Sequence, residues 1–133
     1  MKIYSYPAAK FETNITRFTL PIRALAFNPS GTVLAAAGQD EGIRLINVSD
    51  NKVTSSLKAN DGFPVLSLAF DPQGEYLASA GADGTVHVWS ISGGTIVETF
   101  KRIAPKVDES NLLRNCVCWR PDGSFLAIPG IVS

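Results

Sequence analysis

Few residues in this sequence have the types and spacing that acid–base or covalent chemistry requires. The one histidine, His87, stands between two valines in an alternating apolar stretch, whereas a Ser-His-Asp arrangement needs a base positioned beside its nucleophile. The carboxylate pairs Asp40-Glu41 and Asp108-Glu109 are adjacent in sequence, so their side chains point to different sides. No phosphate-binding glycine motif is present. We therefore expect no enzyme activity.

The two cysteines, Cys116 and Cys118, lack the pattern of a disulfide framework or a metal site. On a strand, side chains two residues apart point to the same face and are poorly placed to pair. One histidine and no C-x-x-C leave too few ligands for a structural zinc ion. We expect no cofactor and no metal, and a reducing, intracellular compartment as the default.

The composition predicts one globular domain without a strong electric field. The 133 residues contain 12 Lys+Arg and 12 Asp+Glu, and 45% of them are hydrophobic. A chain of this length fits one domain, with enough apolar surface to form a core. Zero net charge argues against a dedicated nucleic-acid or membrane binder. No apolar run approaches the roughly 20 residues of a membrane span, and polar residues come too early at the N-terminus for a signal peptide.

An internal repeat organises the chain. Residues 21–58 align with residues 64–101 at an offset of 43 without a gap, and thirteen of the 38 positions are identical. A third copy begins at Val117-Cys118-Trp119, which aligns with Leu68-Ala69-Phe70 at an offset of 49. A fixed repeat of this length indicates one structural unit used several times.

Each copy reads as four short strands joined by tight turns. Residues 65–70 alternate with period two, Asp71-Pro72-Gln73-Gly74 forms a turn, and residues 76–80 form a nearly all-apolar strand. Gly81-Ala82-Asp83-Gly84 forms a second turn, and residues 86–89 and 95–100 supply two more strands. Four strands per 43 residues is typical of a β-propeller blade, and an immunoglobulin-like sandwich has no such repeat. We expect an all-β fold.

The blade ending resembles that of a WD-repeat protein, with Trp89 in the tryptophan position after Val86-His87-Val88. The resemblance implies a structural hydrogen-bond network that contains Ser79, Asp83 and Trp89, and a turn role for Asp40 in the first copy.

Both copies depart from the WD-repeat pattern. Ala59-Asn60 stands where the pattern has Gly-His, and the first copy has Ala36 in place of serine and Ile46 in place of tryptophan. These departures weaken the network but leave the period unchanged.

The repeat divides the chain into four segments of a partial propeller. Residues 1–20 are expected to be the last two strands of a preceding blade, and residues 21–63 a blade with its outer strand and connecting loop. Residues 64–114 are a second blade plus a long inter-blade loop, and residues 115–133 the first two strands of a truncated third blade. A closed propeller needs several more blades, so we expect a piece of a larger propeller that is marginal alone and prone to associate.

Three stretches resemble the WD-repeat and HMG-box DNA-binding protein family, and its plant-type members in particular. They are residues 10–23, Asp40-Glu41-Gly42-Ile43-Arg44-Leu45-Ile46 and Leu126-Ala127-Ile128-Pro129-Gly130. The resemblance implies a position in the N-terminal propeller of a nuclear, chromatin-associated adaptor for DNA replication and repair. It suggests replicative polymerase and helicase components as protein partners. The family's HMG box and its trimerising propeller are not in this sequence, so any association with DNA is expected to be indirect or through regions absent here.

Propellers bind partners mainly on the loops between blades and on the second tight turn of each blade. The predicted partner-binding face therefore contains Arg17, Gln39, Glu41, Asn60, Phe63, Lys101, Arg102, Lys106 and Arg114. Phe63 either anchors a partner or packs against its own blade, and the loop from Lys101 to Arg114 is either a recognition loop or a solvated insertion. We expect a protein-interaction scaffold. The alternative is a generic WD-repeat scaffold, such as a ubiquitin-ligase substrate receptor or a transcription co-regulator.

Overall fold

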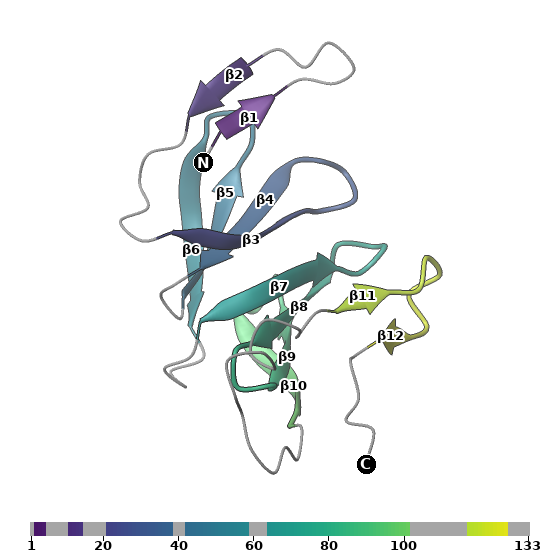
Figure 1. The fold of residues 1–133 in the computed structure, drawn as a ribbon. Helices are drawn as coiled ribbons and strands as arrows, with labels where there is room; N and C mark the ends of the chain where they lie inside the picture. Colours follow the sequence, from purple (N-terminus) through teal and green to yellow (C-terminus); the bar gives the residue numbers. More distant parts are fainter. Residues whose placement is uncertain are drawn as a thin grey trace.

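Each of the two 43-residue repeats forms one four-stranded antiparallel sheet in a computed structural model of the chain (Figure 1). The structure describes residues 2–4, 11–14, 21–38, 42–58, 64–101 and 117–127. The first sheet contains, in order, β3 (Ile22–Phe27), β4 (Val33–Gly38), β5 (Gly42–Asn47) and β6 (Lys52–Lys58). The second contains, in order, β7 (Val65–Phe70), β8 (Tyr76–Gly81), β9 (Val86–Ser90) and β10 (Thr95–Phe100).

Two shorter sheets flank the repeats. β1 (Lys2–Tyr4) pairs with β2 (Phe11–Asn14), and β11 (Cys118–Trp119) pairs with β12 (Leu126–Ala127), both antiparallel. All elements in the described residues are strands, which confirms the expected all-β fold. Over those same ranges, no helix is long and apolar enough to cross a membrane.

Glycines in the left-handed region close the turn between the first two strands of each unit. Gly31, Gly74 and Gly123 have φ of 73°, 74° and 77°. Each donates its backbone N–H to the carbonyl oxygen three residues earlier, at 3.0, 3.0 and 2.8 Å. A side chain at such a φ is strained, and glycine avoids that cost. The chain therefore reverses at the same place in all three units.

A β-bulge lies near the start of each inner strand, and in β7 it interrupts the period-two pattern that the sequence predicts. The register shifts between Ile22 and Ala24 in β3, and between Val65 and Ser67 in β7. An extra residue on one strand moves the following side chains to the other face. This is why Val65 and Leu68, three residues apart, are both buried.

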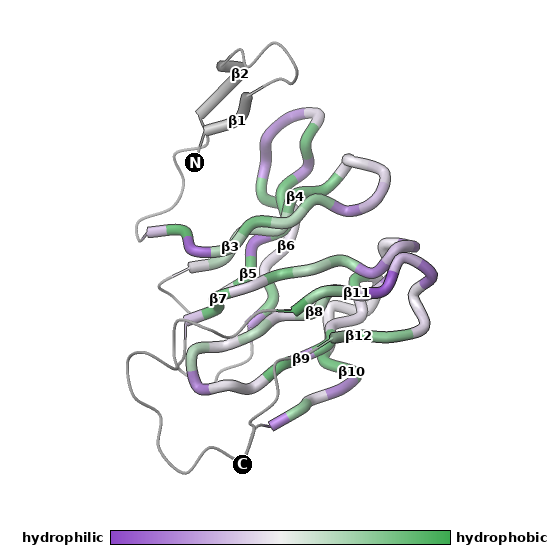
Figure 2. Tube along the Cα trace, turned by 45° about the vertical axis from the view of Figure 1, so that its right-hand side comes forward, coloured by the Kyte–Doolittle hydropathy of each residue, from purple (hydrophilic) through white to green (hydrophobic). Residues whose placement is uncertain are grey.

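The main core lies between the two four-stranded sheets. It joins side chains of the first sheet, including Ile43, Leu45 and Leu57, to Leu77 and Trp89 of the second. In Figure 2 the central strands β4 and β8 run through hydrophobic green segments, and purple segments gather at the turns. Burial of a large aliphatic side chain contributes about 1.5–3 kcal/mol, so this shared core fixes one sheet against the next.

The β11–β12 hairpin extends the stack by half a unit. β11 lies against β7 as β7 lies against β3. Two hydrogen bonds attach the hairpin: Val117 N donates to Ser67 Oγ at 3.2 Å, and Trp119 Nε1 donates to the Ala69 carbonyl at 2.9 Å. A smaller core of Ala78, Ala80, Val86 and Val117 lies beneath it.

Candidate interaction surfaces

The predicted partner-binding face lies almost entirely outside the described residues. Lys101 is described; it follows β10 directly and is exposed. The other predicted residues and Asp40 fall in segments that the structure does not describe, namely Arg17, Gln39, Glu41, Asn60, Phe63, Arg102, Lys106 and Arg114. That face stays a prediction.

Trp89 and Ser79 form a buried polar pair within the second sheet. Trp89 Nε1 donates to Ser79 Oγ at 2.9 Å, and each residue is 3% exposed. The hydroxyl satisfies the one polar group that the buried indole carries. In the first sheet the corresponding residues, Ile46 and Ala36, are both fully buried and belong to an apolar cluster. The hydrogen-bonded pair of the second sheet is therefore replaced by two apolar side chains in the first sheet.

Asp83 bonds within its own turn. Its carboxylate accepts the Thr85 backbone N–H at 3.0 Å and the Thr85 hydroxyl at 2.8 Å. Gly81 and Thr85 close the same turn through a backbone hydrogen bond of 2.8 Å. These bonds hold the tight turn that the glycines on either side of Asp83 predict.

His87 is packed against its neighbours in the sheet. A ring nitrogen lies 3.1 Å from Thr99 Oγ1 on β10, and the ring meets Trp89 edge-on with centroids 6.1 Å apart. The contact with Thr99 joins the neighbouring strands β9 and β10, and the contact with Trp89 lies within β9. Among the described residues no three His, Cys, Asp or Glu side chains gather as a metal site.

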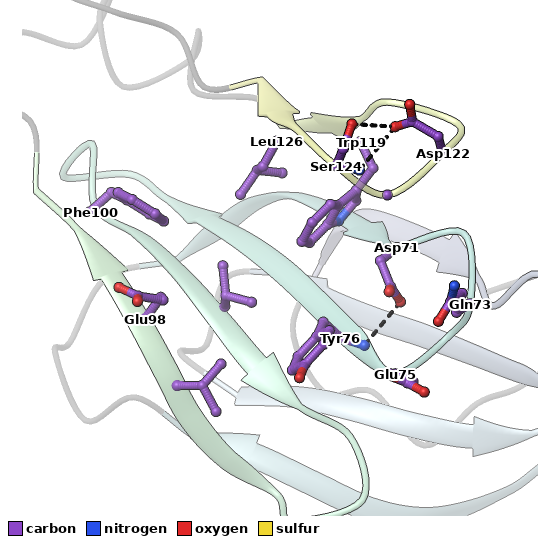
Figure 3. A pocket seen from close by; sticks show the side chains of 13 residues that line it. Asp71, Gln73, Glu75, Tyr76, Glu98, Phe100, Trp119, Asp122, Ser124 and Leu126 are labelled. Carbon is purple, nitrogen blue, oxygen red and sulfur yellow. Dashed lines mark hydrogen bonds between the residues drawn. The ribbon is translucent and has the colours of Figure 1, made fainter.

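A groove lies beside the β11–β12 hairpin, and we call it the Phe100 groove (Figure 3). Its volume is about 570 Å³. The second sheet, the turn after β7 and the β11–β12 hairpin line it with Asp71, Gln73, Glu75, Tyr76, Val88, Val97, Glu98, Phe100, Trp119, Asp122, Gly123, Ser124 and Leu126. In Figure 3, Phe100 and Glu98 come from β10 on one side, and Trp119 and Leu126 come from the hairpin on the other.

The groove is acidic and aromatic. Four carboxylates line it, those of Asp71, Glu75, Glu98 and Asp122, and none of the described residues that line it is basic. Asp71 is buried and accepts the Tyr76 backbone N–H at 3.0 Å. Neighbouring carboxylates favour a positively charged occupant.

Asp122 is held at the mouth of the groove by its own turn. Its carboxylate accepts the Ser124 hydroxyl at 2.6 Å and the Ser124 backbone N–H at 2.9 Å. These hydrogen bonds, the hydroxyl's first, lower the pKa of the Asp122 carboxyl from its ordinary value. Arg120 Nε lies 3.2 Å from the same carboxylate, with both side chains more than half exposed, so that pair contributes little to stability.

Exposure of Phe100 distinguishes this groove from the core between the sheets. Phe100 is 43% exposed, whereas Leu57, its equivalent in the first repeat, is 3% exposed. Leu57 lies in one cluster with Leu77 and Trp89 of the next sheet. The sequence interpretation did not find the groove, because an aromatic residue at the end of an outer strand looks the same whether or not a sheet covers it.

Antiparallel four-stranded sheets that repeat at a fixed offset and share a core between their faces define a WD-repeat β-propeller unit. The match with known families agrees with this class. The chain belongs to the family described as the WDHD1 first WD40 domain, which it matches over residues 1–132.

A curated plant protein shares one short segment with the chain. The chain is similar to Protein ENHANCER OF LHP1 1 of Arabidopsis thaliana, with 68% identity over 28 residues. That segment is 21% of this chain and 3% of the plant protein. The chain thus matches only a small part of that relative's length.

Proposed function

We propose that this chain is part of a non-enzymatic scaffold, within a nuclear, chromatin-associated adaptor that links components of the DNA replication and repair machinery. The observation that carries this proposal is the match to the WDHD1 first WD40 domain over residues 1–132. WD-repeat propellers in general mediate contacts between proteins, and the adaptor role comes from the family resemblance. The short match to the plant relative is consistent with a plant-type member.

The mechanism is the presentation of loops on stiff sheets. The second tight turn of the second sheet is fixed by its own side chains, because the Asp83 carboxylate accepts the Thr85 backbone N–H at 3.0 Å and the Thr85 hydroxyl at 2.8 Å. A loop that leaves such a rigid support loses little entropy when it binds. The partner face is the one predicted from the sequence, including Lys101 and the loop that follows it.

A pull-down with the tagged protein from nuclear extract tests this proposal. We expect recovery of replicative polymerase or helicase subunits, and a loss of that recovery when Arg102, Lys106 and Arg114 are changed to glutamate. Lys52→Glu is the matched control, because Lys52 is exposed on β6, away from the predicted face. Recovery of a ubiquitin-ligase adaptor or a transcription complex in place of replication proteins would establish the generic scaffold instead.

Association with DNA is proposed to be indirect. The chain has zero net charge, and affinity for the phosphate backbone depends on clustered lysine and arginine. The purified chain should therefore show no salt-dependent binding to duplex DNA in a fluorescence anisotropy titration. A steep dependence on salt concentration would contradict this part of the proposal.

A further inference from the structure

Two turns of the described residues contain an aspartate that is followed directly by glycine. They are Asp83-Gly84, between β8 and β9, and Asp122-Gly123, between β11 and β12. Glycine has no side chain to hold its backbone nitrogen away from the preceding carboxyl group. These two peptide bonds are therefore candidate sites for a rearrangement of the backbone that needs no enzyme.

The rearrangement begins when the glycine nitrogen attacks Cγ of the aspartate. An N–Cγ bond forms and closes a cyclic imide, and the hydroxyl of the protonated carboxyl group leaves as water with the amide proton. Water then adds to one of the two imide carbonyls. Addition at Cγ breaks the new bond and restores aspartate, whereas addition at the main-chain carbonyl breaks the original peptide bond and leaves isoaspartate. Water is the only co-reactant, and no group is oxidised or reduced.

Both aspartates are held by the residue that follows the glycine, and in both turns that residue carries a hydroxyl group. Asp83 accepts the backbone N–H and the hydroxyl of Thr85, at 3.0 and 2.8 Å. Asp122 accepts the same two groups of Ser124, at 2.9 and 2.6 Å. These bonds fix the orientation of the carboxylate, so a rotation of it toward the glycine nitrogen has to break them.

The attacking nitrogen is held as well. Gly84 N donates to the Gly81 carbonyl at 3.1 Å, and Gly123 N donates to the Arg120 carbonyl at 2.8 Å. Ring closure removes the proton of this N–H group, so it also breaks the hydrogen bond that closes the turn. In the folded chain both reacting groups are therefore engaged by other partners.

Ionisation is a second obstacle to the reaction at Asp122. The hydrogen bonds from Ser124, the hydroxyl's first, lower the pKa of the Asp122 carboxyl, because they stabilise its charged form. The charged carboxylate is the unreactive form, since the protonated carboxyl group is the one that loses water. The Ser124 hydroxyl thus fixes the orientation of the carboxylate and also keeps it ionised.

From the bonds at the carboxylates and at the glycine nitrogens, we propose that Thr85 and Ser124 protect the Asp-Gly bonds of their turns from isomerisation. Asp122-Gly123 is the site where isoaspartate forms most readily when this protection is lost. Asp122 and Ser124 are exposed, whereas Gly84 and Thr85 are buried. Neighbouring residues therefore shield the Asp83 turn from water, and the Asp122 turn depends on Ser124.

Isomerisation at Asp122 would change how successive turns pack. Isoaspartate lengthens the main chain by one carbon atom and carries its free carboxylate on Cα, so the hydrogen bonds from Ser124 are lost. Gly123 also moves from its place beside the preceding turn, where a Cβ at Gly123 would lie 3.6 Å from Pro72 Cδ. The modification therefore releases the turn between β11 and β12 from the turn between β7 and β8.

Incubation of the purified chain tests the proposal. The unmodified chain, Ser124→Ala, Ser124→Thr and Ser92→Ala are kept at neutral pH and physiological temperature for several weeks, and peptide mapping by mass spectrometry measures isoaspartate at position 122. Ser124→Ala should form it roughly two- to tenfold faster than the unmodified chain, which is the range that one hydrogen bond supplies. Ser124→Thr keeps the hydroxyl, and Ser92 lies in a turn without aspartate, so both variants should match the unmodified chain.

A parallel incubation in guanidinium chloride separates protection by the fold from an effect of the local sequence. The hydrogen bonds of the turn are absent in the unfolded chain, so Ser124→Ala and the unmodified chain should isomerise there at equal rates. Equal rates in the folded proteins, with circular dichroism showing both folded, would overturn the proposal. A difference of the same size in guanidinium chloride would overturn it as well.

Thr85→Val tests the second turn, because valine keeps the shape of threonine and removes its hydroxyl. Isoaspartate at position 83 should form faster in this variant than in the unmodified chain, while its rate at position 122 should stay the same. An unchanged rate at position 83 in the folded variant would exclude protection by Thr85. This inference does not depend on the proposed adaptor function.

Discussion

Gly74, in the turn between β7 and β8, lies directly against Pro29, in the turn between β3 and β4. A Cβ atom at position 74 would come within 3.2 Å of Pro29 Cδ. The next turn repeats the relationship, since a Cβ at Gly123 would lie 3.6 Å from Pro72 Cδ. Successive turns are therefore nested, and the nesting fixes the spacing of the sheets at this end of the stack. A glycine is needed for its φ and also for the close approach.

We expect Gly74→Ala to destabilise the chain more than Gly31→Ala does. Both residues have nearly the same positive φ, so each substitution introduces left-handed strain of about 1 kcal/mol. At Gly31 nothing lies within 4 Å of the new Cβ, whereas at Gly74 it meets Pro29, which adds roughly another 1 kcal/mol of overpacking. Urea denaturation of both variants measures the difference. Equal free energies of unfolding would mean that the turns separate without cost.

Ser79→Ala should destabilise the second sheet by about 1–3 kcal/mol, because it leaves the buried Trp89 Nε1–H without an acceptor. In a Trp89→Ile background the same change should cost less, since the resulting pair copies Ala36 and Ile46 of the first sheet. Thermal unfolding of the four proteins in this double-mutant cycle gives the coupling. Ser92→Ala, in an exposed turn, is the control and should change stability by less than about 0.5 kcal/mol. A coupling near zero would contradict the role of the hydrogen bond.

The repeat and the turns were predictable from the sequence, whereas the open groove was not. Offsets of identical residues are sufficient to place the strands, because Gly and Pro at fixed positions determine where the chain reverses. The bulges at Ile22/Ala24 and Val65/Ser67 were missed, since they depend on how the sheet twists as a whole and not on local residue type.

The difference in exposed fraction between Leu57 and Phe100 also depends on the arrangement of whole sheets and not on local residue type. Their local sequences are alike, with each residue next to a lysine at the end of an outer strand. Their exposures differ because Leu57 has a complete sheet packed over it and Phe100 has only half of one among the described residues. Burial is a property of the neighbouring unit, so it cannot be read from the residue itself.

Asp122 should titrate below its ordinary pKa of 3.8, because the ionised carboxylate is stabilised by its hydrogen bonds with Ser124. A carboxyl whose pKa is lowered in the folded state contributes stability above its unfolded pKa, and this contribution is lost as the pH falls through the folded value. The loss is therefore confined to pH values below about 3.8. NMR titration of the side-chain carboxyl measures the midpoint. Ser124→Ala should raise the midpoint toward 3.8, while Ser92→Ala should leave it unchanged. A midpoint that is the same in Ser124→Ala as in the unmodified chain would contradict this cause.

Trp119→Phe should loosen the β11–β12 hairpin without disturbing the first sheet. The substitution keeps an aromatic ring over the groove but removes the indole N–H that donates to the Ala69 carbonyl at 2.9 Å. The hydrogen bond from Val117 N to Ser67 Oγ at 3.2 Å remains in this variant. The loss of the hydrogen bond from Trp119 costs about 0.5–1.5 kcal/mol. Because this hydrogen bond joins the hairpin to β7, the cost should appear as local opening. Hydrogen exchange should therefore accelerate at residues 117–127 by up to about tenfold, as 1.4 kcal/mol corresponds to a factor of ten. Exchange in β4 and β5 should stay the same; a uniform acceleration across both sheets would mean that the hairpin and the sheets unfold as one unit.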